Sequence, residues 1–61
     1  MTKKELEQFI TDAAGFINWS VENKKDANYM ALNLIHDIMG LARKDSCFVP
    51  RVSGYGKHFK G

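Results

Sequence analysis

Two blocks of apolar residues at helical spacing, separated by a short polar interruption, constrain the fold of this chain more than any other feature. In the first block, apolar side chains recur every three or four residues, at Leu6, Phe9, Ile10, Ala13, Phe16, Ile17 and Val21. The second block repeats the pattern at Met30, Ala31, Leu34, Ile38, Leu41 and Ala42. This period is typical of amphipathic α-helices, so the sequence predicts two helices joined by a turn.

Local signals set the expected helix boundaries. Thr2-Lys3-Lys4-Glu5 has the form of a capping box, so the first helix is expected over about residues 3–22. The polar stretch 22–26 predicts a turn, in which Asn23 or Asp26 can cap the next helix. One continuous helix is the alternative, because no Gly or Pro interrupts the stretch. The second helix is expected over about residues 27–44, with Arg43 and Lys44 at its negative C-terminal end.

The pattern changes in the tail, residues 45–61. Pro50 disfavours helix at Val49 and removes a backbone donor, so residues 47–52 are expected to be extended. Residues 53–56 have turn chemistry. The sequence therefore predicts an all-α fold in one small domain over residues 1–61. Its architecture is a two-helix antiparallel hairpin with an extended C-terminal segment packed against it.

The apolar surface of the second helix is wider than one neighbouring helix can cover. At 100° per residue, its apolar arc spans roughly 200° and includes a flank formed by Leu32, Ile35 and Met39. The tail segment 48–50, a second copy of the chain or a foreign target are the three candidates to cover that flank. A core of this size contributes little stability, and Cys47 is the single cysteine of the sequence, so no disulfide within the chain can form. We therefore expect association, as a homodimer or as a subunit of a complex, with Leu32, Ile35 and Met39 in self-association.

Two large aromatic residues occur where the helical wheel places polar side chains. Trp19 and Tyr29 lie on the polar sides of their helices, where they either pack under the tail or contact a partner. Gly15 and Gly40 lie on the same sides and are expected to let a partner approach the backbone. The residues that we expect to bind another protein are Trp19, Tyr29, His36, Arg51, Tyr55 and Phe59.

No catalytic constellation is evident, so the sequence predicts a protein that is not an enzyme. His36 and Asp37 are adjacent, and side chains at adjacent helix positions diverge by about 100°, so we do not expect the carboxylate to orient the imidazole. Cys47, His36 and His58 lack the spacings of a metal site, and no metal or other cofactor is expected.

The small net charge of +2 is concentrated in the tail, where Arg51, Lys57 and Lys60 outnumber Asp45. Basic residues interleaved with aromatic ones are typical of single-stranded nucleic-acid binding, which makes a nucleic-acid-binding regulator the alternative function. Three cations would release few counterions, so this alternative is less favoured. No stretch has the length of a membrane span and neither polar face is rich in lysine, so we expect a cytoplasmic protein without a membrane partner.

In its size, its balanced charge and its lack of catalytic motifs, the chain resembles accessory proteins of bacteriophages and mobile elements. This resemblance covers no specific motif. Many of those proteins bind and inhibit a host protein, and the resemblance implies a function of the same kind. We therefore expect a small protein-binding module that acts as a regulator or inhibitor by stoichiometric binding to another protein.

Overall fold

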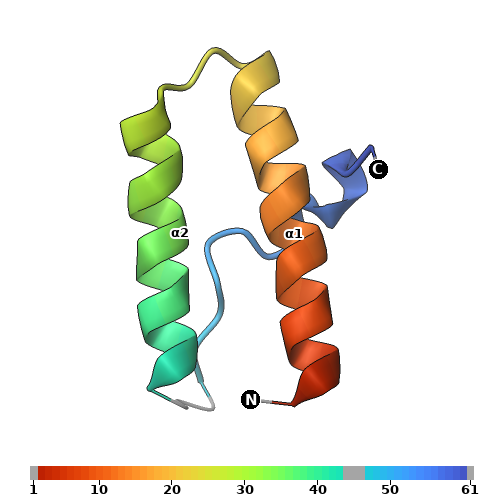
Figure 1. The fold of residues 1–61 in the computed structure, drawn as a ribbon, viewed down its shortest axis with the longest axis vertical. Coiled ribbons are helices and arrows are strands. Elements are labelled where there is room, and N and C mark those ends of the chain that lie inside the picture. Colours follow the sequence, from red (N-terminus) through yellow and green to blue (C-terminus); the bar gives the residue numbers. More distant parts are fainter. Residues whose placement is uncertain (1, 44–46, 61) are drawn as a thin grey trace.

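The structure is a computed structural model, and it describes residues 2–43 and 47–60 of the 61-residue chain. Within those residues it contains two α-helices, α1 over Lys3–Glu22 and α2 over Ala27–Ala42, and a short 3₁₀ helix, η1, over Tyr55–His58, with no strand. The two α-helices run antiparallel, and the tail returns between them (Figure 1). The expected all-α hairpin with a packed C-terminal segment is therefore confirmed.

Side-chain caps begin both helices. The Thr2 hydroxyl accepts a hydrogen bond from the backbone N–H of Glu5 (3.1 Å), as the capping box predicts. The Asp26 carboxylate accepts one from the backbone N–H of Tyr29 (2.8 Å). Asp26 is extended at this position, so the polar stretch is a turn and the alternative of one continuous helix is wrong.

A Schellman motif ends α1. The N–H of Lys25 donates to the carbonyl of Ser20 (2.8 Å), and the N–H of Lys24 donates to the carbonyl of Val21 (3.1 Å). Lys24 takes the left-handed position of this motif, with φ of 58°, where glycine is the usual residue. The chain therefore reverses direction here at some cost in backbone strain.

The end of α2 and the conformation of the tail differ from the prediction in detail. α2 ends at Ala42, with Arg43 as its C-cap, and Lys44 lies outside the described residues. In the tail, residues 48–50 are without regular structure, residues 51–54 form turns, and η1 follows. Gly54 takes φ of 89°, which lets the chain turn sharply into η1. The segment is therefore extended over a shorter stretch than the sequence predicts.

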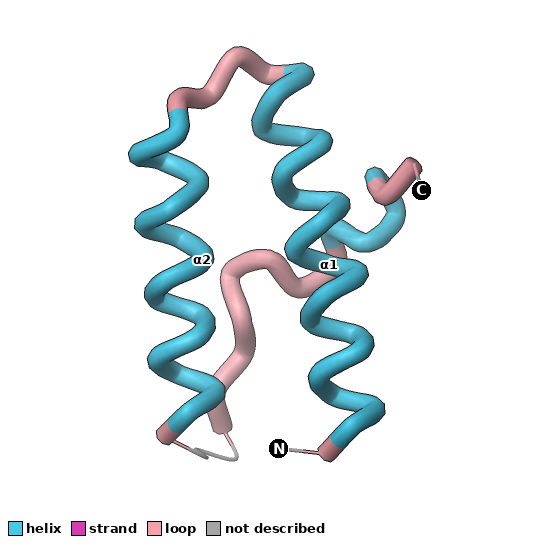
Figure 2. The backbone as a smooth tube through the Cα atoms, viewed as in Figure 1, coloured by secondary structure: helices cyan, strands magenta, loops and turns pink. Residues whose placement is uncertain are grey.

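The tail, and not α2, covers most of the buried side of α1. It enters from the end of α2, crosses between the helices and passes behind α1 in the view of Figure 2, where η1 packs on α1. Direct packing between α1 and α2 is slight by comparison. Among the described residues, Phe16 and Val52 are the buried apolar side chains. The hydrophobic core is therefore small and depends on the tail.

Most of the apolar stripe of α1 lies outside the core. Phe16 is buried, whereas Leu6, Ile10, Ile17 and Val21 are exposed. The buried positions of α1 are instead largely polar or small: Asp12, Gly15 and Ser20 accompany Phe16. The physical reason is that the tail brings backbone groups, which need polar partners, to the polar side of the hairpin.

Candidate functional site

Two buried carboxylates fix the tail on the hairpin, and the first belongs to α2. Asp37 has no exposed surface, and both of its oxygens accept hydrogen bonds from successive backbone N–H groups of the tail. Oδ1 accepts from Arg51 (2.8 Å), and Oδ2 accepts from Val52 (3.0 Å). Because one buried carboxyl group bonds the backbone of two successive residues, Asp37 fixes the point where the tail crosses α2.

The second carboxylate belongs to α1 and holds the start of η1. Asp12 is 7% exposed, and its Oδ1 accepts a hydrogen bond from the backbone N–H of Gly56 (3.1 Å). The same oxygen accepts from the Gln8 side chain one helical turn earlier (3.1 Å). Asp12 therefore holds the tail on α1, and Asp37 holds it on α2.

Each of these aspartates is followed three residues later by a glycine against which the tail packs. A Cβ at Gly15 would overlap the backbone carbonyl of Tyr55, and one at Gly40 would overlap the ring of Phe48. The expectation that these glycines let a foreign partner approach the backbone is therefore wrong. The chain's own tail fills the space instead. The repeated spacing, Asp12–Gly15 and Asp37–Gly40, is a signal that the sequence analysis missed.

An aromatic cluster surrounds Phe16 beneath η1. The Phe16 ring lies 5.1 Å from that of Tyr55, 5.9 Å from that of Tyr29 and 6.4 Å from that of Trp19. Trp19 and Tyr55 also meet edge to face at 5.2 Å. The ammonium of Lys25 lies over Tyr29 at 5.2 Å and over Trp19 at 5.9 Å. The tail thus brings three of the predicted binding residues, Trp19, Tyr29 and Tyr55, into one cluster.

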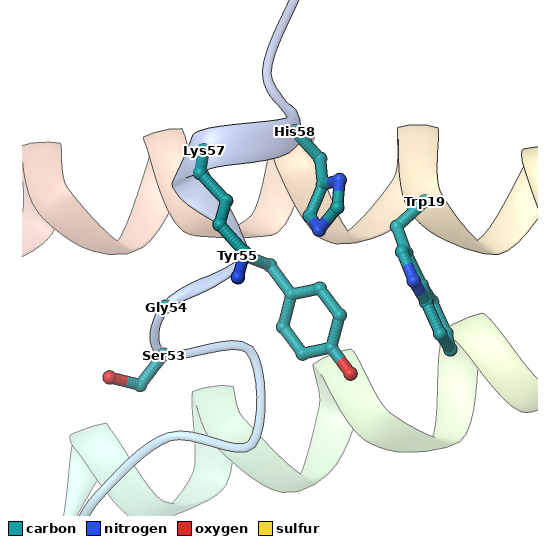
Figure 3. Close-up of a pocket in the computed structure, with 6 residues that line it drawn as sticks. All are labelled: Trp19, Ser53, Gly54, Tyr55, Lys57 and His58. Atoms are coloured by element: carbon teal, nitrogen blue, oxygen red, sulfur yellow. The ribbon is translucent and has the colours of Figure 1, made fainter.

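This cluster borders a shallow pocket of about 350 Å³ on the tail side of the hairpin. The rings of Trp19, Tyr55 and His58 lie beside one another along it, and the Lys57 side chain lies on the other side of Tyr55 (Figure 3). Ser53 and Gly54 complete the lining. The pocket combines flat rings with a cationic group, and its Tyr and Trp rings are side chains that are enriched in protein–protein contacts.

The other predicted binding residues lie elsewhere on the tail and on α2. The Arg51 guanidinium is exposed, with Nη1 at 3.5 Å from the Asn33 side-chain oxygen. Phe59 is exposed just after η1. The His36 ring is partly exposed and lies 5.7 Å from that of Phe48. None of these side chains joins the aromatic cluster in a described ring contact.

The geometric argument against a contact between His36 and Asp37 is wrong. Nδ1 of His36 lies 3.1 Å from Oδ1 of Asp37. The 100° divergence applies to the directions in which side chains leave the helix, and rotation about the side-chain bonds brings the ring nitrogen back to the carboxylate. Because the carboxylate also accepts backbone N–H groups, the pair serves the attachment of the tail.

The basic residues of the tail are partly engaged within the fold. Lys60 forms a hydrogen-bonded ion pair with Glu22 at the end of α1. The hydrogen bond and the positive charge of Lys60 lower the pKa of Glu22 below its ordinary value. The Tyr55 ring packs on Phe16, which leaves its face less available for stacking on a base. These contacts weaken the support for the nucleic-acid alternative.

The opposite side of the hairpin is apolar and uncovered. We call it the apolar face, and it consists of Leu6, Ile10, Ile17 and Val21 of α1 and Leu32, Ile35, Ile38 and Met39 of α2, all exposed. On a wheel at 100° per residue, the α1 group is centred roughly 180° from the midpoint of Asp12 and Gly15. The α2 group is centred roughly 160° from the midpoint of Asp37 and Gly40. Both groups therefore lie on the sides of their helices away from these contacts with the tail.

The flank expected to self-associate lies on this face. Leu32 is 67% exposed, Ile35 is 53% exposed and Met39 is 52% exposed, so neither the tail nor α1 covers them. Full burial of a side chain of this type contributes about 1.5–3 kcal/mol, and a half-exposed one retains about half of that to be gained. Covering the whole apolar face is therefore worth several kcal/mol, a large amount for so small a domain.

Comparison with family models, with curated protein sequences and with solved structures finds no match to this chain. Neither of the described α-helices combines the length and the continuous apolar character needed to cross a bilayer. Within residues 2–43 and 47–60, no group of three or more His, Cys, Asp or Glu side chains is arranged to hold a metal ion.

Proposed function

We propose that this chain is a small non-catalytic regulator that acts in the cytoplasm by stoichiometric binding to another protein. Inhibition of a host protein, in the manner of phage and mobile-element accessory proteins, is the form of this activity that its size favours. The observation that carries the proposal is the tail side of the hairpin, where the rings of Trp19, Tyr55 and His58 and the ammonium of Lys57 surround the pocket.

The attachment of this surface to both helices supports the proposal. The tail that carries it is tied to both helices by backbone bonds to Asp12 and Asp37 and by close packing on Gly15 and Gly40. A surface that is already ordered loses little conformational entropy on binding, which favours affinity. Tyr and Trp supply a large contact area at low entropic cost, and a cation beside them adds specificity.

The hydrogen-bond partners of the two buried aspartates support the proposal that this protein is not an enzyme. A catalytic acid or base needs contact with the reacting group of a substrate. The buried carboxylates of Asp12 and Asp37 instead accept hydrogen bonds from backbone N–H groups of the tail. A structural task for both groups accounts for their burial without invoking catalysis.

Affinity capture with charge-reversed baits tests the proposal. Arg51→Glu and Lys57→Glu alter exposed side chains on the tail side, and Lys3→Glu makes the same change of charge at an exposed position in the first turn of α1. Wild type and Lys3→Glu are expected to retain a partner at a fixed molar ratio to the bait. Each tail variant is expected to lose about tenfold or more of this partner, because the substitution removes a cation from the contact and replaces attraction with repulsion between like charges.

Equal recovery with all four baits would contradict the proposed surface, and recovery of nothing above background would contradict the proposed function. Nuclease treatment of the lysate separates the alternative. A partner that disappears with nuclease, and whose binding falls steeply with salt, would favour the nucleic-acid-binding regulator.

A further inference from the structure

We propose that the apolar face is the dimer interface of this protein, covered by the same face of a second copy in a two-fold symmetric four-helix bundle. This inference goes beyond the proposed function, because it concerns the side of the hairpin opposite the tail. A second copy of the chain is the proposed partner of this face, and four properties support it.

The first property is the absence of exposed charge on α2. Within Ala27–Ala42, α2 contains no Lys, Arg or Glu, and its acid, Asp37, is buried on the tail side. In a two-fold symmetric interface, each patch contacts the same patch of the second copy, so a charge near the symmetry axis would face a charge of the same sign. The α2 part of the apolar face contains no such charge, so pairing α2 with α2 of a second copy incurs no electrostatic penalty. On the wheel, Lys3 lies on the same side of α1 as Ile10 and Val21, so the charge-free surface is that of α2. A foreign partner that recognises a surface specifically commonly uses a charge pattern, which the α2 part of this face lacks.

The second property is the area. The chain exposes 4535 Å², whereas a folded monomer of its mass, 6.9 kDa, is expected to expose roughly 4000 Å². The broad side of the molecule measures 32 × 23 Å. A stable interface of standard size buries about 800 Å² on each partner, which the broad side of this hairpin is large enough to supply.

The third property is the thickness. The shortest extent of the backbone is 14 Å, so the two α-helices lie in one layer, with part of the tail between them and η1 against α1. Domains are built from two packed layers around one core. A second hairpin stacked on the apolar face supplies the missing layer and produces the arrangement of a four-helix bundle.

The fourth property is the spacing along α2. Leu32, Ile35, Met39 and Ala42 follow one another at intervals of three and four residues, the repeat that brings side chains of two helices together as knobs in holes. This seam lies on the side of α2 opposite Asp37 and Gly40, which contact the tail. It is therefore available to a helix of a second copy.

The oligomeric mass of the purified chain tests the inference. Sedimentation equilibrium of the wild type at micromolar concentration is expected to give twice the chain mass of 6.9 kDa. Ile35→Glu places a charge in the interface and is expected to weaken self-association by about 100-fold or more. The control is Val49→Glu, which makes a similar change at a position that is 71% exposed on the tail, and it is expected to leave the mass unchanged.

Three results would overturn the inference. They are a wild type that is folded and monomeric at high micromolar concentration, a dimer that Ile35→Glu leaves intact, and a dimer that Val49→Glu dissociates as readily as Ile35→Glu does. None of them removes the proposed function, because the affinity capture uses the tail side and does not depend on dimerisation.

A measurement on the wild type alone keeps the test decisive if Ile35→Glu does not fold. A dimer unfolds at a higher midpoint temperature as its concentration rises, because association stabilises the folded state by mass action. Circular dichroism over a hundredfold range of concentration is expected to show this rise. A midpoint that does not change would overturn the inference.

Discussion

Asp12 and Asp37 are acidic side chains inside the fold, and both accept hydrogen bonds from backbone N–H groups of the tail. Burial of a carboxylate is unfavourable unless its oxygens are bonded, and a buried N–H group without an acceptor is costly in the same way. At Asp37, the carboxyl oxygens and the backbone N–H groups of the tail supply one another with hydrogen-bond partners. The position of the tail therefore depends on a few polar contacts more than on hydrophobic area.

Replacement of Asp37 tests this dependence. Asp37→Ala leaves the N–H groups of Arg51 and Val52 without their acceptor and is expected to lower the free energy of unfolding by about 2–4 kcal/mol. Denaturation with urea, followed by helical circular dichroism, measures the change. The control is Glu7→Ala at an exposed position of α1, and a similar loss in both variants would contradict the role given to Asp37.

The two mid-helix glycines provide a second test at this scale. Gly→Ala inside a helix ordinarily stabilises it by about 1 kcal/mol. At Gly15 the new methyl group would overlap the Tyr55 backbone, and we expect a net loss of about 1–3 kcal/mol in unfolding free energy. At Gly40 the obstacle is the Phe48 ring, a side chain that can rotate, so the loss is expected to be smaller. Thermal unfolding compares the variants, and stabilisation by Gly15→Ala would count against the observed tail position.

At the scale of the elements, the sequence predicts the helices well and the tail poorly. Thr2 and Asp26 cap the helices through local contacts that a short stretch of sequence contains in full. The packing of the tail depends on bonds such as that from Gly56 to Asp12, which join residues distant in the sequence. Apolar periodicity identifies which side of a helix is apolar, but here the tail packs on the other side and buries it.

The turn between the helices yields a prediction that is independent of the tail. Lys24 adopts φ of 58°, a conformation that costs about 1–2 kcal/mol for a residue with a Cβ. Lys24→Gly is therefore expected to raise the free energy of unfolding by about 1 kcal/mol, whereas Lys24→Ala keeps the strain and is expected to give no such gain. Urea denaturation distinguishes the two, and equal stability of both variants would contradict the strain argument.

The ion pair between the end of the tail and the end of α1 predicts a dependence on pH. Lys60 lowers the pKa of Glu22, so the pair favours the folded state when Glu22 is ionised. This contribution is present above the ordinary pKa of Glu22 and is lost as pH falls through its lowered pKa. Lys60→Gln is expected to raise the pKa of Glu22 toward the ordinary value in a carboxyl NMR titration, and an unchanged pKa would show that the pair does not form.

At the scale of the whole molecule, the hairpin has two unlike sides. One side carries the tail, the aromatic cluster and the pocket, and it is held by polar contacts. The other side is the apolar face, which leaves Leu32, Ile35 and Met39 exposed. The sequence predicts a surplus of apolar helix surface, and the structure locates it on both helices. The proposed dimer and the proposed partner therefore use different sides, and one protein can bind both at once.

This account depends on the tail lying on the polar side of the hairpin, against the two glycines, and a proton NOE spectrum of the folded protein measures that directly. Glycine Hα signals are distinct, so cross-peaks from the Phe48 ring to Gly40 and from Tyr55 to Gly15 are expected. Their presence, with slow exchange of the Val52 and Gly56 amide protons, agrees with the carboxylate contacts. If both cross-peaks are missing and those amide protons exchange as fast as in an unfolded chain, the tail lies elsewhere and the account is wrong.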